Sequence, residues 1–458
     1  MTEFPNDECR LLCLDGLPKA TNAQERFLMS KMGASALFNE RLQTRVLQAA
    51  GRCTRALQDR SAVFITGHEL QDYLADDRNW RHFHPELQAE LAFGVYQSKE
   101  TKPSELMASF RSFIANDSDW DEANSQIVDD AATKHQAPYP AMDELEKVVT
   151  HEVGYQKALW GDDLDGALLE ARAITAELTA PELRGYRALW YYLAGSVNQM
   201  LSIEAGDGHD RSAREQFASA KAAAPSVPWL SLLTRSSSDA SESTDPQHSV
   251  EVTVQVEKLE AVLLGFGTVS DHKFEKHAKL ILESLQGEKQ FEEGQRLLGS
   301  MLGFDAGNDE SDAAPDPWWL GHSIGLVFED HAASKSQTIL GARKAKQAAL
   351  HPNWVQDNVP EAANLKLSVA LVTPCLAAGA GAKPSLKLVR YWQLDDFRNW
   401  AKNAIDVIRS LKGALPPGSD LIWRIDAANK LVSAGLDLQS IIESLAFASD
   451  QMTFQQKK

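Results

Sequence analysis

The sequence predicts a protein of the α/β plus α class, in which an all-helical middle separates two α/β regions. Two short apolar runs that end at glycine turns, Cys9–Leu17 and Ser61–Thr66, are typical of buried strands and alternate with helical patterns. From about residue 86 to 235 the pattern is almost wholly helical, and an α/β pattern returns after residue 250. We therefore expect an α/β part at 1–85, a helical array at 86–235, a linker at 236–249 and a second α/β domain at 250–458.

The N-terminal part is expected to contain a strand at 9–17, helices at 22–34 and 39–58, and a strand at 61–66 that is closed by Gly67. Strands that alternate with helices favour a parallel sheet. Two strands are too few for a complete doubly wound domain, so we expect the rest of such a domain to lie upstream.

The middle part places small residues where helices would cross. Ala167, Ala171 and Ile174 share one helical face, and Ala213, Phe217 and Ala220 share another. Paired helices of this kind resemble tetratricopeptide-like repeats, although no fixed period is present. The polar stretch Ser236–Ser249 then predicts a linker.

The C-terminal domain is expected to begin with helices at 254–262, 272–285 and 291–302. A strand at 324–329, a helix at 336–350 that stops near His351–Trp354, and a strand at 367–373 follow. A helix at 395–412 and two more helices complete the domain.

The composition limits the function classes. The net charge is −18, so the chain is not a general polyanion binder, and nucleic acid would have to meet local basic clusters. The four cysteines form no CxxC pair, which argues against a zinc site or disulfides and fits a cytoplasmic location. No apolar run reaches eighteen residues, so no membrane span is expected. The two basic clusters are Arg41, Arg45, Arg52, Arg55 and Arg60, and Lys335, Arg343, Lys344 and Lys346.

A QxxGRxxR pattern occupies residues 48–55. On a helix, Gln48, Arg52 and Arg55 at i, i+4 and i+7 share one face. Two guanidinium groups on a rigid face can hold the oxygens of a transferring phosphoryl group, because arginine stays charged and offers a planar fork of donors. The alternative interpretation is a solvated basic helix face.

This pattern resembles motif VI of superfamily 2 helicases of the DEAD/DEAH type, especially the DinG-like group. Leu11–Pro18 and Asn22–Arg26 resemble the strand, turn and helix that open the second RecA-like lobe, and the resemblance covers about residues 8–80. It implies that Gln48, Arg52 and Arg55 face ATP bound between two RecA-like lobes.

The ATP-binding half of such a motor is not in this sequence. No GxxxxGK[ST] loop and no DEAH or DEAD box occurs, and both are needed to hold nucleotide and its metal ion. We therefore expect the chain to be the C-terminal portion of a larger or split helicase, with an N-terminal helicase lobe supplied in cis or in trans.

A second pattern lies at residues 315–331, where Pro315-Asp316 precedes an apolar run that ends in Glu329. This resembles the core of PD-(D/E)XK nucleases, and the resemblance implies a restriction-endonuclease-like fold. It implies Asp316 and Glu329 as Mg²⁺ ligands, Glu292 as a third acid, and Gln347 on the next helix. His331 stands where the lysine of these nucleases would be, and Lys335 follows in the next loop. The alternative interpretations are a plain turn at Asp316 and a surface acid at Glu329.

The sequence thus favours the C-terminal portion of an ATP-dependent helicase with a nuclease-like appendage. Its partner would be nucleic acid, with DNA preferred, in bacterial defence or DNA processing. Two alternatives remain open. One is a divalent-metal DNA nuclease with an inert motor remnant, and the other is a helical interaction protein without chemistry.

Overall fold

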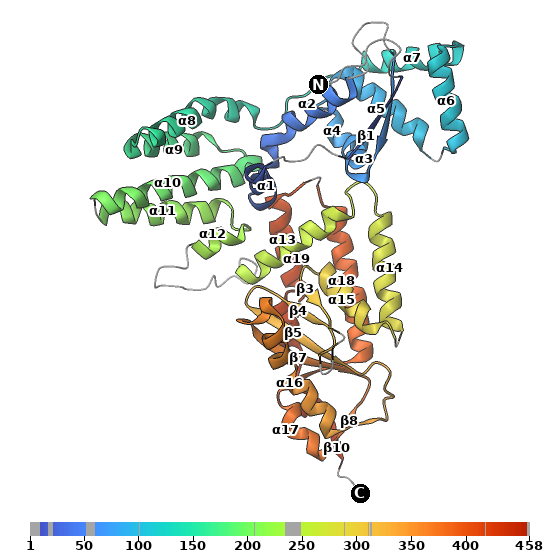
Figure 1. Ribbon diagram of the computed structural model, residues 1–458, viewed down its shortest axis with the longest axis vertical. Helices are drawn as coiled ribbons and strands as arrows, with labels where there is room; N and C mark the ends of the chain where they lie inside the picture. The colour runs from blue at the N-terminus through green and yellow to red at the C-terminus, as the bar shows by residue number, and fades with distance from the viewer. Residues whose placement is uncertain are drawn as a thin grey trace. The chain divides into compact units, whose positions relative to one another are not determined.

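The computed structural model describes residues 10–16, 22–51, 60–99, 101–205, 207–233, 249–287, 289–309, 311, 314–416 and 418–455. The chain divides into two compact units, residues 1–223 and 224–458 (Figure 1). The first is mostly helical with one small sheet, and the second is mixed α/β. This confirms the predicted class of α/β plus α. No helix in the described ranges is long and apolar enough to span a membrane.

The first unit opens with two parallel strands, β1 (Leu11–Asp15) and β2 (Ala62–Thr66), as the alternating pattern predicted. Leu14 and Ile65 of these strands pack with Val46, Leu70 and Phe83 in a small core. The helices of this part are α1 (Ala23–Arg26), α2 (Asn39–Ala50), α3 (His68–Ala75), α4 (Asp77–Trp80), α5 (Pro85–Ser98), α6 (Pro103–Ala115) and α7 (Ser118–Ala131).

Helix α2 begins at Asn39, as the sequence predicted. It ends at Ala50, where Gly51 caps it by donating its backbone N–H to the carbonyl groups of Leu47 and Ala49. The expected helix at 39–58 is confirmed over residues 39–50, and its remainder falls on residues 52–59, which lie outside the described part of the chain. The expected helix at 22–34 is split into α1 and a π-helical turn, Phe27–Lys31.

Four long helices complete the first unit and lie side by side (Figure 1). They are α8 (Met142–Trp160), α9 (Leu164–Glu177), α10 (Arg184–Ala205) and α11 (Asp207–Ala223). Ala167, Ala171 and Ile174 are completely buried between them, as predicted. Trp190 packs edge to face against Tyr155 in the same core.

The second unit is built on a five-stranded sheet in the order β3-β4-β5-β7-β9. The first three strands form an antiparallel meander, and β5, β7 and β9 are parallel to one another. These strands are β3 (Asp305–Gly307), β4 (Trp318–Leu320), β5 (Ile324–Asp330), β7 (Lys366–Thr373) and β9 (Val389–Gln393). A smaller parallel sheet contains β6 (Ile339–Leu340), β8 (Ala377–Gly379) and β10 (Thr453–Gln455).

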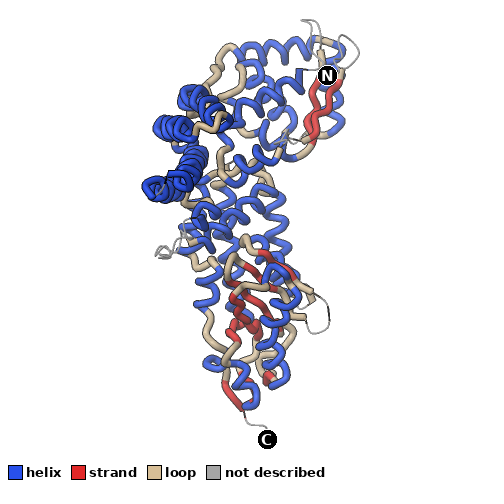
Figure 2. The backbone as a smooth tube through the Cα atoms, turned by 60° about the vertical axis from the view of Figure 1, so that its left-hand side comes forward, coloured by secondary structure: helices blue, strands red, loops and turns tan. Residues whose placement is uncertain are grey.

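Helices cover both faces of the larger sheet (Figure 2). On one face, Phe328 and Ala370 pack with α13, α14, α15, α18, α19 and α20. On the other face, Val327 and Val369 pack with α16. The bounds are α12 (Pro228–Leu233), α13 (Val250–Gly265), α14 (His272–Gln286), α15 (Phe291–Met301), α16 (Ala342–Asn358), α17 (Lys383–Leu386), α18 (Leu394–Gly413), α19 (Leu421–Ser433), α20 (Leu438–Ser444) and α21 (Ala448–Gln451).

Two boundaries in this unit differ from the prediction. Helix α16 starts at Ala342 and continues through Pro352 to Asn358, so the expected stop near His351 is wrong. Its last turns persist because Val355 is fully buried with Val327 and Trp318, and this packing offsets the hydrogen bond that Pro352 cannot donate. Helix α12, expected in the helical array, belongs to the second unit.

Trp319 on β4 is the largest completely buried side chain, and it lies directly against α15. Its indole N–H donates to the carbonyl oxygen of Gln295 at 3.0 Å. The approach depends on Gly299, because a Cβ atom there would lie 2.1 Å from Trp319 Nε1. The close packing of Trp319 and its hydrogen bond thus hold β4 against α15 beside Gln295.

A buried ion pair joins α13 to α19. Arg424 and Glu260 are each only 1 % exposed, and Arg424 Nη2 lies 2.7 Å from Glu260 Oε2. The other oxygen of Glu260 accepts the backbone N–H of Asp420 at 2.8 Å. Both charges therefore have close partners in the interior.

Candidate functional site

The hairpin of β4 and β5 brings Asp316 beside the end of β5. Asp316 lies in the turn before β4, and its Oδ2 accepts a hydrogen bond from the backbone N–H of Asp330. Antiparallel pairing of the two strands produces this return, since Trp318 pairs with Val327. The structure thus brings the aspartate of the Pro-Asp pattern next to the acids Glu329 and Asp330.

Neighbouring residues of β5 project toward opposite layers, as the period of two in a strand requires. Phe328 and Asp330 face the layer that contains α15, whereas Val327 and Glu329 face α16. The two acids at the strand end therefore lie in different environments.

On the α15 side, Asp330 meets Gln295. Gln295 is fully buried, and its Nε2 lies 3.5 Å from Asp330 Oδ1. Gln295 Oε1 and Asp330 Oδ2 are both buried atoms without a hydrogen-bond partner among the described residues. Glu292, one turn before Gln295 on α15, is exposed to solvent. It also lies close enough to Asp316 to interact with its carboxyl group.

Crowding and burial disfavour the charged forms of these acids. Burial raises the pKa of Asp316 to about 7; the hydrogen bond from Asp330 opposes the rise, and the charges of Glu329 and Glu292 add to it. Burial also raises the pKa of Asp330 well above its ordinary value, and repulsion from Asp316 and Glu292 adds to this rise. Without a counter-charge, at least one of these two carboxyl groups holds a proton at neutral pH.

On the α16 side, two histidines hold Glu329. His331 Nε2 lies 3.1 Å from Glu329 Oε1, and His351 Nε2 lies 2.5 Å from Oε2. Burial by itself would raise the pKa of Glu329, but the hydrogen bonds to His331 and His351 outweigh it and lower the pKa to about 2. Glu329 is therefore an ionised carboxylate whose two oxygens both have imidazole partners.

A lysine from α16 joins this second group. Lys344 Nζ lies 3.1 Å from His331 Nδ1, so an ammonium group stands beside the residue that replaces the motif lysine. The side chain of Lys335 is exposed to solvent, and the backbone N–H of Lys335 donates to the hydroxyl group of Thr338. Gln347, on the same helix as Lys344, is exposed.

The sequence did not single out Asp330, Gln295 or His351 for this site, and it placed Lys344 only in a basic cluster. Asp330 could have been found, because the alternation along β5 sends the residue after Glu329 to the other layer. His351 could not, since its contact with Glu329 depends on how α16 crosses the sheet.

The motor motif is described only at its first residue. Gln48 is exposed in the last turn of α2, while Arg52 and Arg55 lie outside the described residues. The prediction that Gln48, Arg52 and Arg55 share one helix face therefore stays a prediction, because two of the three residues lie outside the described part of the chain. Of the same basic cluster, Arg41 pairs with Glu25 at 2.6 Å.

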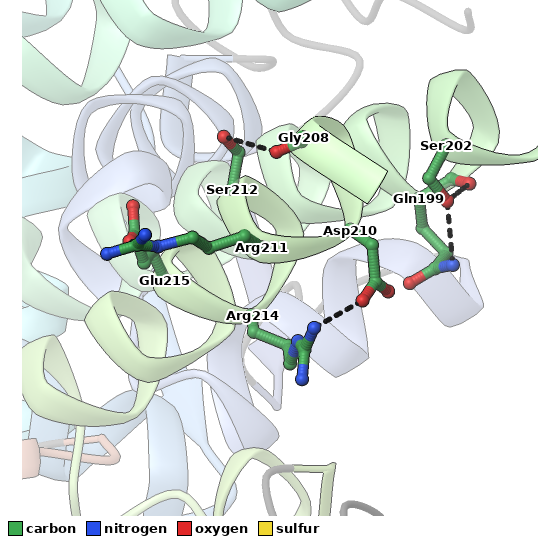
Figure 3. Close-up of polar contacts among 8 residues, drawn as sticks. All are labelled: Gln199, Ser202, Gly208, Asp210, Arg211, Ser212, Arg214 and Glu215. Carbon is green, nitrogen blue, oxygen red and sulfur yellow. Dashed lines mark hydrogen bonds and ion pairs between the residues drawn. The ribbon is translucent and has the colours of Figure 1, made fainter. Parts of the chain in front are cut away.

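Helix α11 presents another charged surface (Figure 3). Arg214 pairs with Asp210 at 2.5 Å, and Arg211 pairs with Glu215 at 3.1 Å, both at a spacing of four residues. Such exposed pairs contribute only about 0.3–0.5 kcal/mol each and neutralise one another. This face is a solvated helix surface and carries no site.

Comparisons with protein-family models, with curated proteins and with solved structures found no match to this chain. Within the described ranges, no three His, Cys, Asp or Glu side chains are arranged as a ready-made metal site. The assignment of a function therefore depends on the geometry of the two side-chain groups at the end of β5.

Proposed function

We propose that the C-terminal unit is a divalent-cation-dependent, nuclease-like domain that acts on DNA. The observation that carries this proposal is the return of Asp316 onto the end of β5, where an acid at a turn meets the acids Glu329 and Asp330. The PD-(D/E)XK pattern requires this juxtaposition. A bound Mg²⁺ ion would activate water and stabilise charge on the scissile phosphate.

Lys344 takes the electrostatic role of the lysine that the pattern lacks at position 331. Its ammonium group lies beside His331, and His331 in turn contacts Glu329. A cation there lowers the cost of bringing a phosphate toward the acids of the site. Lys344 is exposed, so substrate can reach it from solvent.

Asp316→Asn is expected to lower Mg²⁺- or Mn²⁺-dependent cleavage of linear DNA by more than about 10-fold, since metal sites lose at least this much when a ligand or its support is removed. Lys344→Met should also reduce cleavage. The measurement is loss of labelled linear DNA without ATP. Asp357→Asn on α16 and Lys387→Met after α17, which change exposed residues outside the two basic clusters, are the matched controls. Cleavage by wild type that is unchanged in Asp316→Asn would contradict the proposal.

The N-terminal residues support a second proposed function, as part of the second lobe of a helicase motor. Strands β1 and β2 are parallel neighbours, and α2 lies between them in the chain, as in α/β lobes. Nucleic acid and ATP would then be shared with an N-terminal helicase lobe that carries the P-loop. The nuclease-like unit would process the strands that this motor separates.

When this chain is joined to a lobe with a P-loop and a DEAH-type box, Arg52→Ala is expected to lower kcat for ATP hydrolysis by at least about 10²-fold. An arginine that stabilises the transferring phosphoryl group contributes about 10³–10⁵ in rate. Nucleotide affinity should change much less. Arg60→Ala is the control, and an equal loss in both variants would argue against the motor assignment.

A further inference from the structure

Two buried oxygen atoms of adjacent side chains on the α15 side of the sheet have no hydrogen-bond partner among the described residues. They are Gln295 Oε1 and Asp330 Oδ2, and the two side chains are joined by the 3.5 Å contact between Gln295 Nε2 and Asp330 Oδ1. A buried acceptor without a partner destabilises the native state, because it has given up its hydrogen bonds to water. Gln295 is also held in place, because Trp319 bonds to its backbone carbonyl group.

Asp316 adds a second carboxylate to this group. One of its oxygens accepts the backbone N–H of Asp330, which fixes the carboxylate against the strand that carries Asp330. Two carboxylates and a carboxamide supply only oxygen ligands, and these are the ligands that Mg²⁺, Mn²⁺ and Ca²⁺ prefer. Mg²⁺ in particular uses one or two carboxylates and fills its other positions with water and phosphate oxygens.

We propose that Asp316, Asp330 and the side-chain amide oxygen of Gln295 bind one divalent cation on the α15 side of the sheet. The inference rests on the proposed function, because this ion would be the one that DNA cleavage uses, but binding can be measured without cleavage. Glu292, exposed one turn before Gln295, adds negative charge near Asp316. The site needs no third His, Cys, Asp or Glu ligand.

Glu329, the acid that the PD-(D/E)XK pattern implies as a ligand, has a different role in this proposal. Its two oxygens contact His331 and His351, and it faces α16. A cation that took Glu329 would have to displace a buried imidazole from each oxygen used. Asp330, with a free buried oxygen, is the better ligand at the end of β5.

The test is a calorimetric titration of MnCl₂ into the full chain, without DNA. Wild type should bind one ion. Asp330→Asn and Asp316→Asn should each raise the dissociation constant at least about 10-fold, and Gln295→Leu should raise it by a smaller factor. Glu329→Gln should raise it by less than Asp330→Asn does, and Asp357→Asn, which changes an exposed residue of α16, should leave it unchanged. Because binding to the native state raises Tm, a shift of Tm with MnCl₂ provides a second measurement that also reports folding of each variant.

Four outcomes separate this inference from the proposed nuclease function. No Mn²⁺ binding by wild type overturns the site, as does binding that Glu329→Gln abolishes and a folded Asp330→Asn retains. Binding that depends on Asp330, in a protein that does not cleave DNA, supports the cation site and overturns nuclease activity. Cleavage that survives in a folded Asp330→Asn variant supports nuclease activity and overturns the site.

Discussion

Replacement of Arg424 by methionine is expected to lower the free energy of unfolding of the second unit by about 3–5 kcal/mol. The substitution removes the guanidinium group and leaves the carboxylate of Glu260 in the interior, with only the backbone N–H of Asp420 as a described hydrogen-bond partner. Both side chains of the pair are 1 % exposed, so water cannot replace the lost partner. The cost is that of an uncompensated buried charge.

Urea unfolding followed by far-ultraviolet circular dichroism measures this change. Arg409→Met is the matched control, because Arg409 pairs with Glu275 at the surface, where both side chains are more than 40 % exposed. It should cost only about 0–1 kcal/mol. The double variant Glu260→Gln/Arg424→Met should recover part of the loss. Equal losses in Arg424→Met and Arg409→Met would contradict the interpretation.

Asp316→Asn is expected to stabilise the metal-free protein relative to wild type, by an amount that grows as the pH rises from about 4 to 7. The native pKa of Asp316 is about 7, against 3.8 for the ordinary group, so between these values the native state holds a proton that the unfolded state has lost. The unfolded state binds fewer protons, and the free energy of unfolding therefore falls as pH rises through this window. Each unit of pKa difference is equivalent to about 1.4 kcal/mol, so the change amounts to a few kcal/mol.

Unfolding free energies of wild type and Asp316→Asn, measured from pH 4 to 8 with a chelator present, give this difference directly. The curves should separate in favour of the variant toward pH 8. Asp357→Asn, at an exposed position, should run parallel to wild type. Glu329 has the opposite sign: its lowered pKa stabilises the native state above about pH 4.5, and this stabilisation is lost as the pH falls toward 2 in wild type and variant alike. Parallel curves for wild type and Asp316→Asn would contradict the prediction.

The sequence predicted the strands that form from apolar runs ending at turn residues. It did not predict β3, β4, β6, β8, β9 or β10, which are only two to five residues long. Strands at 11–15, 62–66 and 324–330 lie where the runs predicted them, and the first two are parallel. The helix boundaries were less predictable. The local pattern predicts that α16 ends before Pro352. The burial of Val355 keeps the helix intact, and packing between distant residues cannot be seen in such a pattern.

The candidate site was predictable only in part. The spacing between Pro315-Asp316 and Glu329 correctly brought Asp316 to the end of β5. It did not show that Glu329 would meet two histidines, because one of these, His351, lies 22 residues further along the chain on another element. Gln295 was also invisible, since a glutamine on an amphipathic helix has no local feature that marks it as buried.

The packing of Trp319 against Gly299 has a consequence for inheritance and for engineering. Gly299 lies four positions after Gln295 on α15, and a side chain at 299 would collide with the indole that donates to the carbonyl oxygen of Gln295. Such a substitution lies in the apolar interior and touches no charged group. A screen for cation affinity at the proposed site should nevertheless detect a substitution of Gly299. The sequence requirements of that proposed site therefore include a glycine that no catalytic pattern contains.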